Sequence, residues 1–135
     1  MSVLRTIFIF LAAARTFPLA AEPVKVHAVE AELVSELDSI QPGKPFTVAI
    51  RYKIDPTWHI YWLNPGAFGQ VTKMDWQLPD GFTASALEFP VPYQFLTGGF
   101  AGYGYEDETM LLAQITPPAN LEAGANIELK GTTFW

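Results

Sequence analysis

The chain has 135 residues, enough for one domain with a substantial hydrophobic core. Its 14 acidic residues outnumber the 8 basic ones, which gives a net charge of −6, and the basic residues are scattered along the sequence. Such a chain repels phosphate backbones, so nucleic-acid binding is disfavoured. The sequence contains no cysteine, which excludes thiol chemistry within these residues.

The first 21 residues have the pattern of a secretory signal peptide. A short basic start at residues 1–5 precedes an apolar run at 6–14, and small residues lie just before Glu22. The run is too short to span a bilayer, which takes about 20 helical residues. An amphipathic N-terminal helix is the alternative. Removing residues 1–21 takes away two of the 8 basic residues and no acidic one, so the domain at 22–135 would carry a net charge of −8.

Alternating apolar and polar residues predict a series of short strands in the remaining chain. Residues 24–37 fit a strand, although a helical stripe fits them as well. Residues 46–54 give the clearest signal, because apolar side chains occupy every second position. Further strands are predicted at 58–62, 73–78, 82–89, 110–115 and 127–135, with turns containing proline or glycine at 41–44, 55–57, 64–66 and 79–81.

About seven or eight short strands with no long helical pattern are typical of an all-β fold. We therefore predict an immunoglobulin-like antiparallel β-sandwich over residues 22–135. The sequence stops at Phe134-Trp135 within its last alternating run. We accordingly expect the domain to be incomplete at its C-terminal end.

The densest aromatic segment is residues 58–62, Trp-His-Ile-Tyr-Trp, which is followed by an Asn-Pro-Gly turn. On a pleated strand, His59 and Tyr61 point to one side and the residues between them to the other. We expect the His59 and Tyr61 side to line a site. The residues expected to pack in the core, rather than stack on sugars, are Trp58, Ile60, Trp62 and Trp76.

Residues 97–108 interleave four glycines with aromatic residues and end in three acids. Glycine widens the conformations open to a loop, and aromatic side chains let the loop press on a surface. We interpret residues 98–105 as a cap loop that acts through Phe100, Tyr103 and Tyr105. An ordinary turn folded onto the edge of the sandwich is the alternative. The glycine spacing fits no phosphate-binding pattern.

Other catalytic or metal-binding patterns are weak. The two histidines, His27 and His59, belong to no metal-binding spacing, so neither a metal site nor a cofactor is predicted. The serines lack a nucleophile elbow. Glu106 and Glu108 are interpreted as a solvated acidic face rather than a catalytic pair. No residue of this chain is predicted to be catalytic by itself.

Several motifs occur in a fixed order: Gln-Pro-Gly at 41–43, Trp-His-Ile-Tyr-Trp at 58–62, Asn-Pro-Gly at 64–66 with Gly69, Trp-Gln-Leu-Pro-Asp-Gly at 76–81, Phe-Pro-Val-Pro at 89–92 and Gly-Tyr-Glu at 104–106. Together they resemble the N-terminal periplasmic domain of the DsbD and ScsB group of thiol:disulfide interchange proteins. The resemblance implies an immunoglobulin-like periplasmic domain. Such a domain receives electrons from a membrane-embedded domain of the same polypeptide and passes them to periplasmic thiol oxidoreductases.

The resemblance also implies roles for individual residues. In the family, two cysteines in a late hairpin carry the chemistry beneath an aromatic cap. Here His59 and Tyr61 would line that site, residues 98–105 would form the cap, and the cysteine pair would follow Trp135. The chain as given is therefore expected to have no reductase activity. The full-length protein would be anchored in the inner membrane, would carry a thioredoxin-like domain and would belong to the cytochrome c biogenesis type.

A function of a different class stays open from the sequence. A cysteine-free binding or scaffold module could use His59, Tyr61 and the cap loop to hold a partner protein or a glycan. The gene beyond residue 135 separates the two hypotheses. A cysteine pair followed by apolar spans of about 20 residues supports the first, and a stop codon supports the second.

Overall fold

The computed structural model describes residues 21–135. The predicted signal peptide lies outside the described residues, except for Ala21. The described part contains ten strands and no helix, and so no helix there could cross a membrane. The strands are β1 (Val24–Val26), β2 (Val29–Ser35), β3 (Phe46–Ile54), β4 (Ile60–Gly66), β5 (Lys73–Gln77), β6 (Thr83–Ala84), β7 (Tyr93–Thr97), β8 (Phe100–Tyr105), β9 (Glu108–Thr116) and β10 (Lys130–Phe134).

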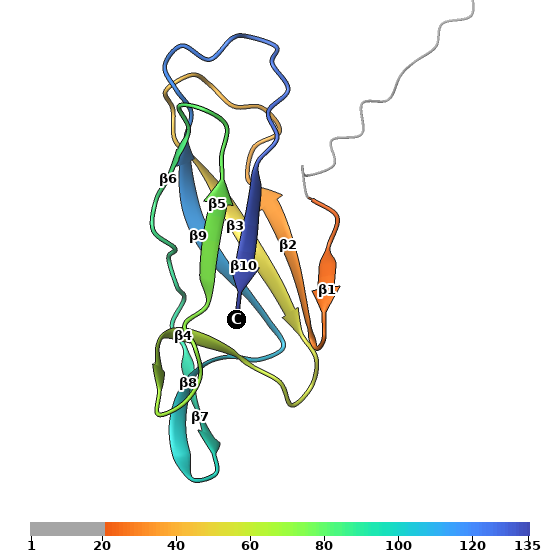
Figure 1. Ribbon diagram of the computed structural model, residues 1–135, viewed down its shortest axis with the longest axis vertical. Coiled ribbons are helices and arrows are strands. Elements are labelled where there is room, and N and C mark those ends of the chain that lie inside the picture. The colour runs from red at the N-terminus through yellow and green to blue at the C-terminus, as the bar shows by residue number, and fades with distance from the viewer. Residues whose placement is uncertain (1–20) are drawn as a thin grey trace, which may run out of the picture.

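Two layers of antiparallel strands enclose the core (Figure 1). The larger sheet has the order β1-β2-β3-β9-β6, and the two-stranded sheet β5-β10 lies across it. A third sheet has the order β4-β8-β7, and its hairpin β7–β8 extends from one end of the sandwich. The prediction of an all-β, immunoglobulin-like antiparallel sandwich is confirmed.

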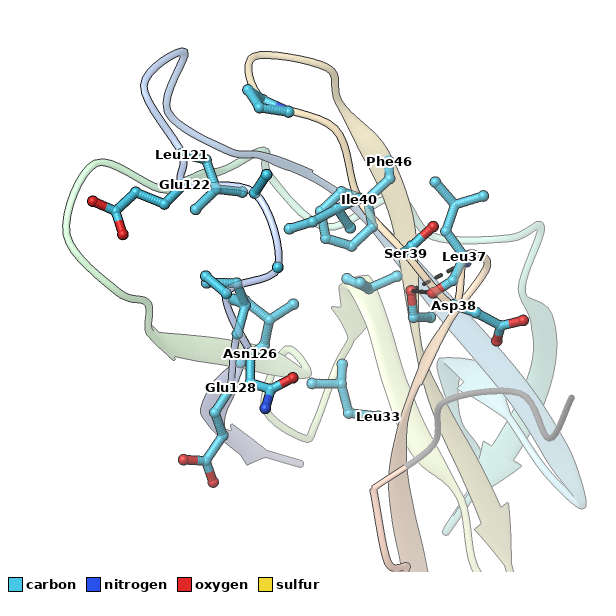
Figure 2. A pocket seen from close by; sticks show the side chains of 18 of the residues that line it. Leu33, Leu37, Asp38, Ser39, Ile40, Phe46, Leu121, Glu122, Asn126 and Glu128 are labelled. Carbon is cyan, nitrogen blue, oxygen red and sulfur yellow. Dashed lines mark hydrogen bonds between the residues drawn. The ribbon is translucent and has the colours of Figure 1, made fainter. Parts of the chain in front are cut away.

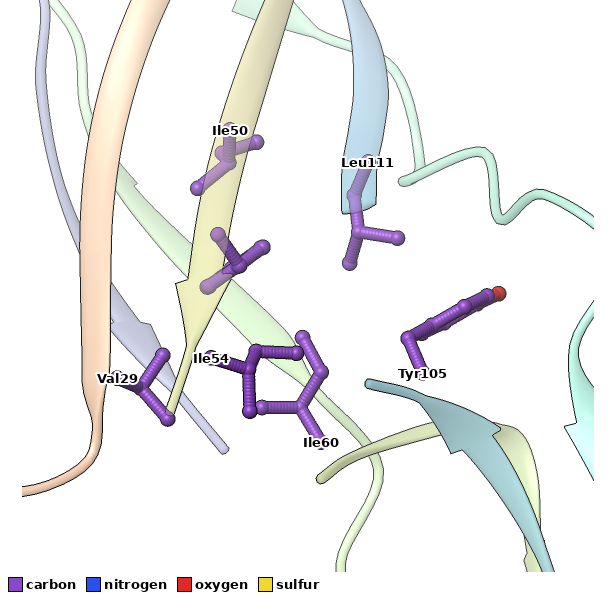
Figure 3. Close-up of a cluster of buried hydrophobic side chains, with 7 residues drawn as sticks. Val29, Ile50, Ile54, Ile60, Tyr105 and Leu111 are labelled. Carbon is purple, nitrogen blue, oxygen red and sulfur yellow. The ribbon is translucent and has the colours of Figure 1, made fainter. Parts of the chain in front are cut away.

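The alternation predicted for residues 46–54 is confirmed in β3, the central strand of the larger sheet. Its inward side chains are at most 5% exposed, and β9 mirrors them with residues that are fully buried. Each large apolar side chain buried in this way contributes about 1.5–3 kcal/mol. Figure 3 shows one of the two resulting core clusters, which consists of Val29, Ile50, Tyr52, Ile54, Ile60, Tyr105 and Leu111.

Tyr52 connects the two layers through its ring and its hydroxyl group. The hydroxyl forms a hydrogen bond with Thr133 Oγ1 of β10, and Thr133 Oγ1 donates in turn to the carbonyl oxygen of Lys73 at 3.0 Å. The ring of Trp135 packs edge-on against Tyr52, with 6.1 Å between centroids. Burial raises the pKa of Tyr52 to about 12, and the bond to Thr133 opposes that rise.

Several predicted boundaries are wrong. Residues 24–37 form a hairpin of β1 and β2 rather than one strand, because His27 takes a positive φ of 53° and turns the chain. The predicted strand at 82–89 is reduced to β6 and an isolated bridge at Glu88. The last strand begins at Lys130 rather than at 127. β4 does not stop before the Asn-Pro-Gly motif but runs through it and ends at the last residue of the motif, Gly66, with a register shift between Tyr61 and Gly66.

The predicted packing of three tryptophans in the core is confirmed for two of them and wrong for the third. Trp62 and Trp76 pack against the core, as expected. Trp58 does not, because it is 56% exposed and lies before β4 begins. Thr57 just before it has a φ of 72°, a left-handed conformation that β-branched residues rarely adopt, and this turn breaks the alternation.

We expect the free energy of unfolding to fall between about pH 10 and about pH 12. Burial raises the pKa of both Tyr52 and Tyr105 from 10.0 to about 12 in the folded protein. The unfolded chain therefore releases these protons first, and the stabilising contribution, complete below pH 10, is lost as the pH rises through 12. Urea unfolding at stepped pH measures the loss.

The substitution Tyr52→Phe should flatten this part of the pH dependence. Tyr103→Phe is the matched control, because Tyr103 is half-buried outside the two core clusters. An identical pH dependence in wild type and Tyr52→Phe would contradict the assignment.

Candidate functional site

Ile60 sets the direction in which the aromatic segment faces. Its side chain is fully buried in the core cluster of Figure 3, and it pairs with Tyr105 of β8. Because successive side chains alternate, His59 and Tyr61 lie on the opposite side of the strand, away from the core. Both are half-buried.

His59 and Tyr61 contact each other and Phe95 of β7. His59 Nε2 and the Tyr61 hydroxyl are 3.0 Å apart and share a hydrogen bond, and the two rings are nearly perpendicular with centroids 5.0 Å apart. The ring of Phe95 lies 4.0 Å from that of His59 and 5.8 Å from that of Tyr61, between centroids. We call these three residues the aromatic triad.

Two glycines of β8 allow the triad to form. Tyr61 pairs with Gly104 on one side of β8, and Phe95 pairs with Gly102 on the other. Residues that pair directly point to the same face of a sheet, so the rings of β4 and β7 both lie over positions without side chains. A Cβ atom on Gly102 would come within 2.6 Å of the Phe95 ring, and one on Gly104 within 2.1 Å of the Ile60 carbonyl oxygen. The glycines therefore serve close packing.

Tyr61 is also held from its other side by residues 67–72. Thr72 is almost fully buried and donates a hydrogen bond from its hydroxyl to the Tyr61 carbonyl oxygen at 2.8 Å. Gly69 lies against the Tyr61 ring with a φ of 101°, and a Cβ atom there would come within 2.3 Å of that ring. Only glycine fits both the backbone conformation and the space.

Residues 98–105, expected as a loop, are the turn and second strand of the hairpin β7–β8. Phe100 lies beside the turn, 55% exposed, with its ring edge-on to Phe68 at 5.1 Å between centroids. Both of these rings line one shallow hollow together with Tyr61 and Phe95, and the hollow has no room for a water molecule. Phe100 thus lies near the triad, at its exposed margin.

Tyr103 and Tyr105 lie elsewhere on β8. Tyr103 is half-buried and pairs with Gln94. Tyr105 is only 5% exposed within the core, and its hydroxyl donates to the carbonyl oxygen of Pro90 at 2.6 Å. Tyr105 therefore anchors the segment that leads into β7 instead of covering the triad.

Phe95, the residue that covers His59, is not predicted from the sequence. The signal was the pair of alternating glycines at 102 and 104, which marks a strand that leaves space for rings from its neighbours. Locating the partner ring also requires the pairing of β7 with β8, which the local pattern does not contain.

The triad provides aromatic surface and one imidazole–phenol hydrogen bond. Within residues 21–135 no group of three or more metal-ligating side chains occurs, and His27 lies apart in the β1–β2 turn. At the margin of the triad, two exposed aromatic rings pack edge-on, Phe100 from the hairpin β7–β8 and Phe68 from the segment after β4, and exposed apolar side chains of this kind are typical of a surface that contacts another macromolecule. We call this surface the hairpin patch; it consists of Phe68 and Phe100, each 55% exposed.

We expect Gly69→Ala to destabilise the protein by about 1 kcal/mol more than Gly99→Ala. Both glycines have positive φ, 101° and 87°, so alanine strains the backbone at each, by about 1–2 kcal/mol. Only Gly69 also faces a ring, since no atom lies within 4 Å of a Cβ atom at Gly99. Urea unfolding compares the two variants, and equal losses would show that Gly69 does not support Tyr61.

The family described as "Thiol:disulfide interchange protein DsbD, N-terminal" matches residues 25–134. Among solved structures, the fold is similar to the crystal structure of the N-terminal periplasmic domain of ScsB from Proteus mirabilis, with a TM-score of 0.59 and 13% sequence identity. The match covers 87% of this chain and 50% of that chain, and at this identity it concerns the fold alone. No curated protein matches by sequence. On the family match, the chain belongs to the DsbD N-terminal family of thiol:disulfide interchange proteins.

Proposed function

We propose that this domain is the periplasmic relay unit of a thiol:disulfide interchange protein. It receives electrons from a membrane-embedded domain of the same polypeptide and passes them to periplasmic thiol oxidoreductases. Family membership over residues 25–134 supports the reaction class. The observation that carries the proposal is the aromatic triad, in which Phe95 of the hairpin β7–β8 packs on the hydrogen-bonded pair of His59 and Tyr61.

In this proposal the thiols come from a cysteine pair that follows Trp135 in the full-length protein. A thiolate of the pair attacks one sulfur of a partner disulfide, a mixed disulfide forms, and the partner's other sulfur leaves as a thiolate that takes up a proton. The second cysteine of the pair, as a thiolate, then attacks the mixed disulfide, so that the pair becomes a disulfide and the partner leaves with both of its sulfurs reduced. His59 and Tyr61 line the pair and donate hydrogen bonds that favour the thiolate.

The hairpin β7–β8 acts as the cover of the thiol site between encounters. Phe95 closes over His59 at 4.0 Å between ring centroids, and the hairpin patch offers apolar surface to the incoming oxidoreductase. Gly98 and Gly99 form the turn at the tip with no atom within 4 Å of either Cβ position, so the tip is unobstructed. Binding of a partner to the patch would thereby be coupled to exposure of the thiols.

The remaining parts of the proposal concern the whole protein. Residues 1–21 direct export to the periplasm, and the full-length protein is held in the inner membrane, where it also carries a thioredoxin-like domain. Its relay serves periplasmic disulfide reduction of the cytochrome c biogenesis type. The acidic charge of the chain fits protein partners rather than nucleic acid.

We expect the purified 135-residue chain to show no insulin reduction above a buffer control, because its sequence contains no cysteine. Turbidity of precipitating insulin B chain in the presence of dithiothreitol measures the reaction, and thioredoxin serves as the positive control. Turnover by the chain that survives removal of contaminating thioredoxin would contradict the proposal.

A cysteine-free binding module is the second candidate function. The exposed side chains of the hairpin patch favour it, because such a surface can hold a partner protein or a glycan without any thiol. The downstream gene sequence decides between the candidates: the relay requires a cysteine pair after Trp135, whereas the binding module does not.

We expect a periplasmic oxidoreductase of the thioredoxin fold to shift the backbone amide signals of residues 95–102 in NMR titrations, whereas maltoheptaose leaves them unchanged. Phe100→Ser should weaken this binding about tenfold, as for an aromatic residue central to an interface. Val91→Ser is the control, since Val91 is 93% exposed outside the hairpin patch. Shifts caused by the saccharide alone would favour the glycan-binding module.

A further inference from the structure

The connections at 37–42 and 121–129 lie at the end of the sandwich opposite to the hairpin β7–β8 (Figure 1), and a second hollow lies between them. The connection at 121–129 forms one wall, and the end of β2 with residues 37–42 forms the other; Figure 2 shows their side chains facing each other across the gap. Its volume of about 780 Å³ is in the range of sites that hold a ligand or a peptide segment. Much of the lining is apolar and includes Leu33, Phe46, Leu121 and Ile127. We call this hollow the 121–129 groove.

One wall of the groove has the pattern of a strand without a strand partner. Ile127 and Leu129 are half-buried, whereas Asn126 and Glu128 are exposed, which is the two-residue period of a strand. Pairing with β5 starts only at Lys130, and residues 126–129 form no backbone–backbone hydrogen bond within the described chain. Free backbone groups along an extended segment are a template for an added strand.

The rim of the groove is acidic. Asp38, Glu122 and Glu128 line it, and no basic side chain does. Glu128 pairs with Lys130 at 3.1 Å, whereas Asp38 and Glu122 form no ion pair with any residue from 21 to 135. Charge complementarity therefore favours a basic occupant and disfavours an acidic one.

We propose that the 121–129 groove is a docking site for an extended segment of a partner protein in which apolar and basic residues alternate. The backbone of the segment pairs with residues 126–129. Its apolar side chains pack over Leu33 and Phe46, and its basic side chains reach Asp38 and Glu122. The groove shares no residue with the aromatic triad or the hairpin patch, so this inference and the proposed function can fail separately.

The test uses the purified protein and the synthetic peptide acetyl-Lys-Val-Lys-Val-Lys-Val-amide. We expect saturable NMR shifts at residues 126–129 and slower hydrogen exchange of their amides in the complex, with no shifts at residues 95–102. Two further analogues carry a methyl group on the backbone nitrogen of every lysine or of every valine. One of the two should lose binding, and the other should keep it. The reason is that only alternate amides of a strand face the edge with which it pairs.

The acidic rim is tested with the double variant Asp38→Asn/Glu122→Gln, which should weaken peptide binding about fivefold, as expected for two exposed charges. The double variant Asp75→Asn/Glu106→Gln is the matched control and should leave the dissociation constant unchanged, because both side chains are exposed outside the groove. Binding of the wild type should also weaken at high salt.

Three results would overturn the inference. The first is equal binding of acetyl-Glu-Val-Glu-Val-Glu-Val-amide, which would remove the role of charge. The second is binding of the basic peptide without protection of residues 126–129, which would remove strand addition. The third is protection of these residues from hydrogen exchange in the absence of peptide, together with self-association of the protein in sedimentation. That result would make a second copy the occupant.

Discussion

The geometry of the site depends on the burial of Ile60. Its side chain is fully enclosed in the core, and its two neighbours, His59 just before β4 and Tyr61 within it, lie together on the opposite face. A slip of one residue would exchange the two faces and place an imidazole and a phenol in the apolar interior. The burial of Ile60 in the core therefore also fixes the side on which His59 and Tyr61 lie.

The glycines of β8 add the second element of the site, and here the sequence interpretation and the structure differ in kind. Read locally, Gly102 and Gly104 indicate a flexible loop. In the sheet they are positions where side chains must be absent, so that Tyr61 and Phe95, on opposite neighbours of β8, can approach to 5.8 Å between ring centroids. The pairing of β8 with β4 on one side and with β7 on the other, rather than a loop conformation, brings the triad together.

The sequence predicts correctly those strands in which apolar and polar residues alternate along the whole strand. In β3 every second side chain is buried, and the strand and its inward residues were foreseen. The failures occur where a single backbone angle overrides the period, as at His27 and Thr57, whose positive φ values turn the chain without glycine. Phe95 is not predicted from the sequence, because its contact with His59 depends on the pairing of β4 and β7 with β8. No local pattern near His59 or Phe95 predicts that pairing.

The hairpin β7–β8 and the 121–129 groove lie at opposite ends of the sandwich (Figure 1). This separation would let the protein bind a thiol oxidoreductase at one end while an extended segment is held at the other. The two surfaces also differ in chemistry: the hairpin patch is apolar and aromatic, whereas the groove has an acidic rim.

Proton–proton nuclear Overhauser effects between the rings of His59 and Phe95 test the central claim most directly. The account predicts strong effects in the wild type, because the ring centroids lie 4.0 Å apart, and their loss in Gly102→Ala, where the new methyl group displaces the Phe95 ring. Effects that connect the His59 ring to Ile54 or Leu111 of the core instead would contradict it.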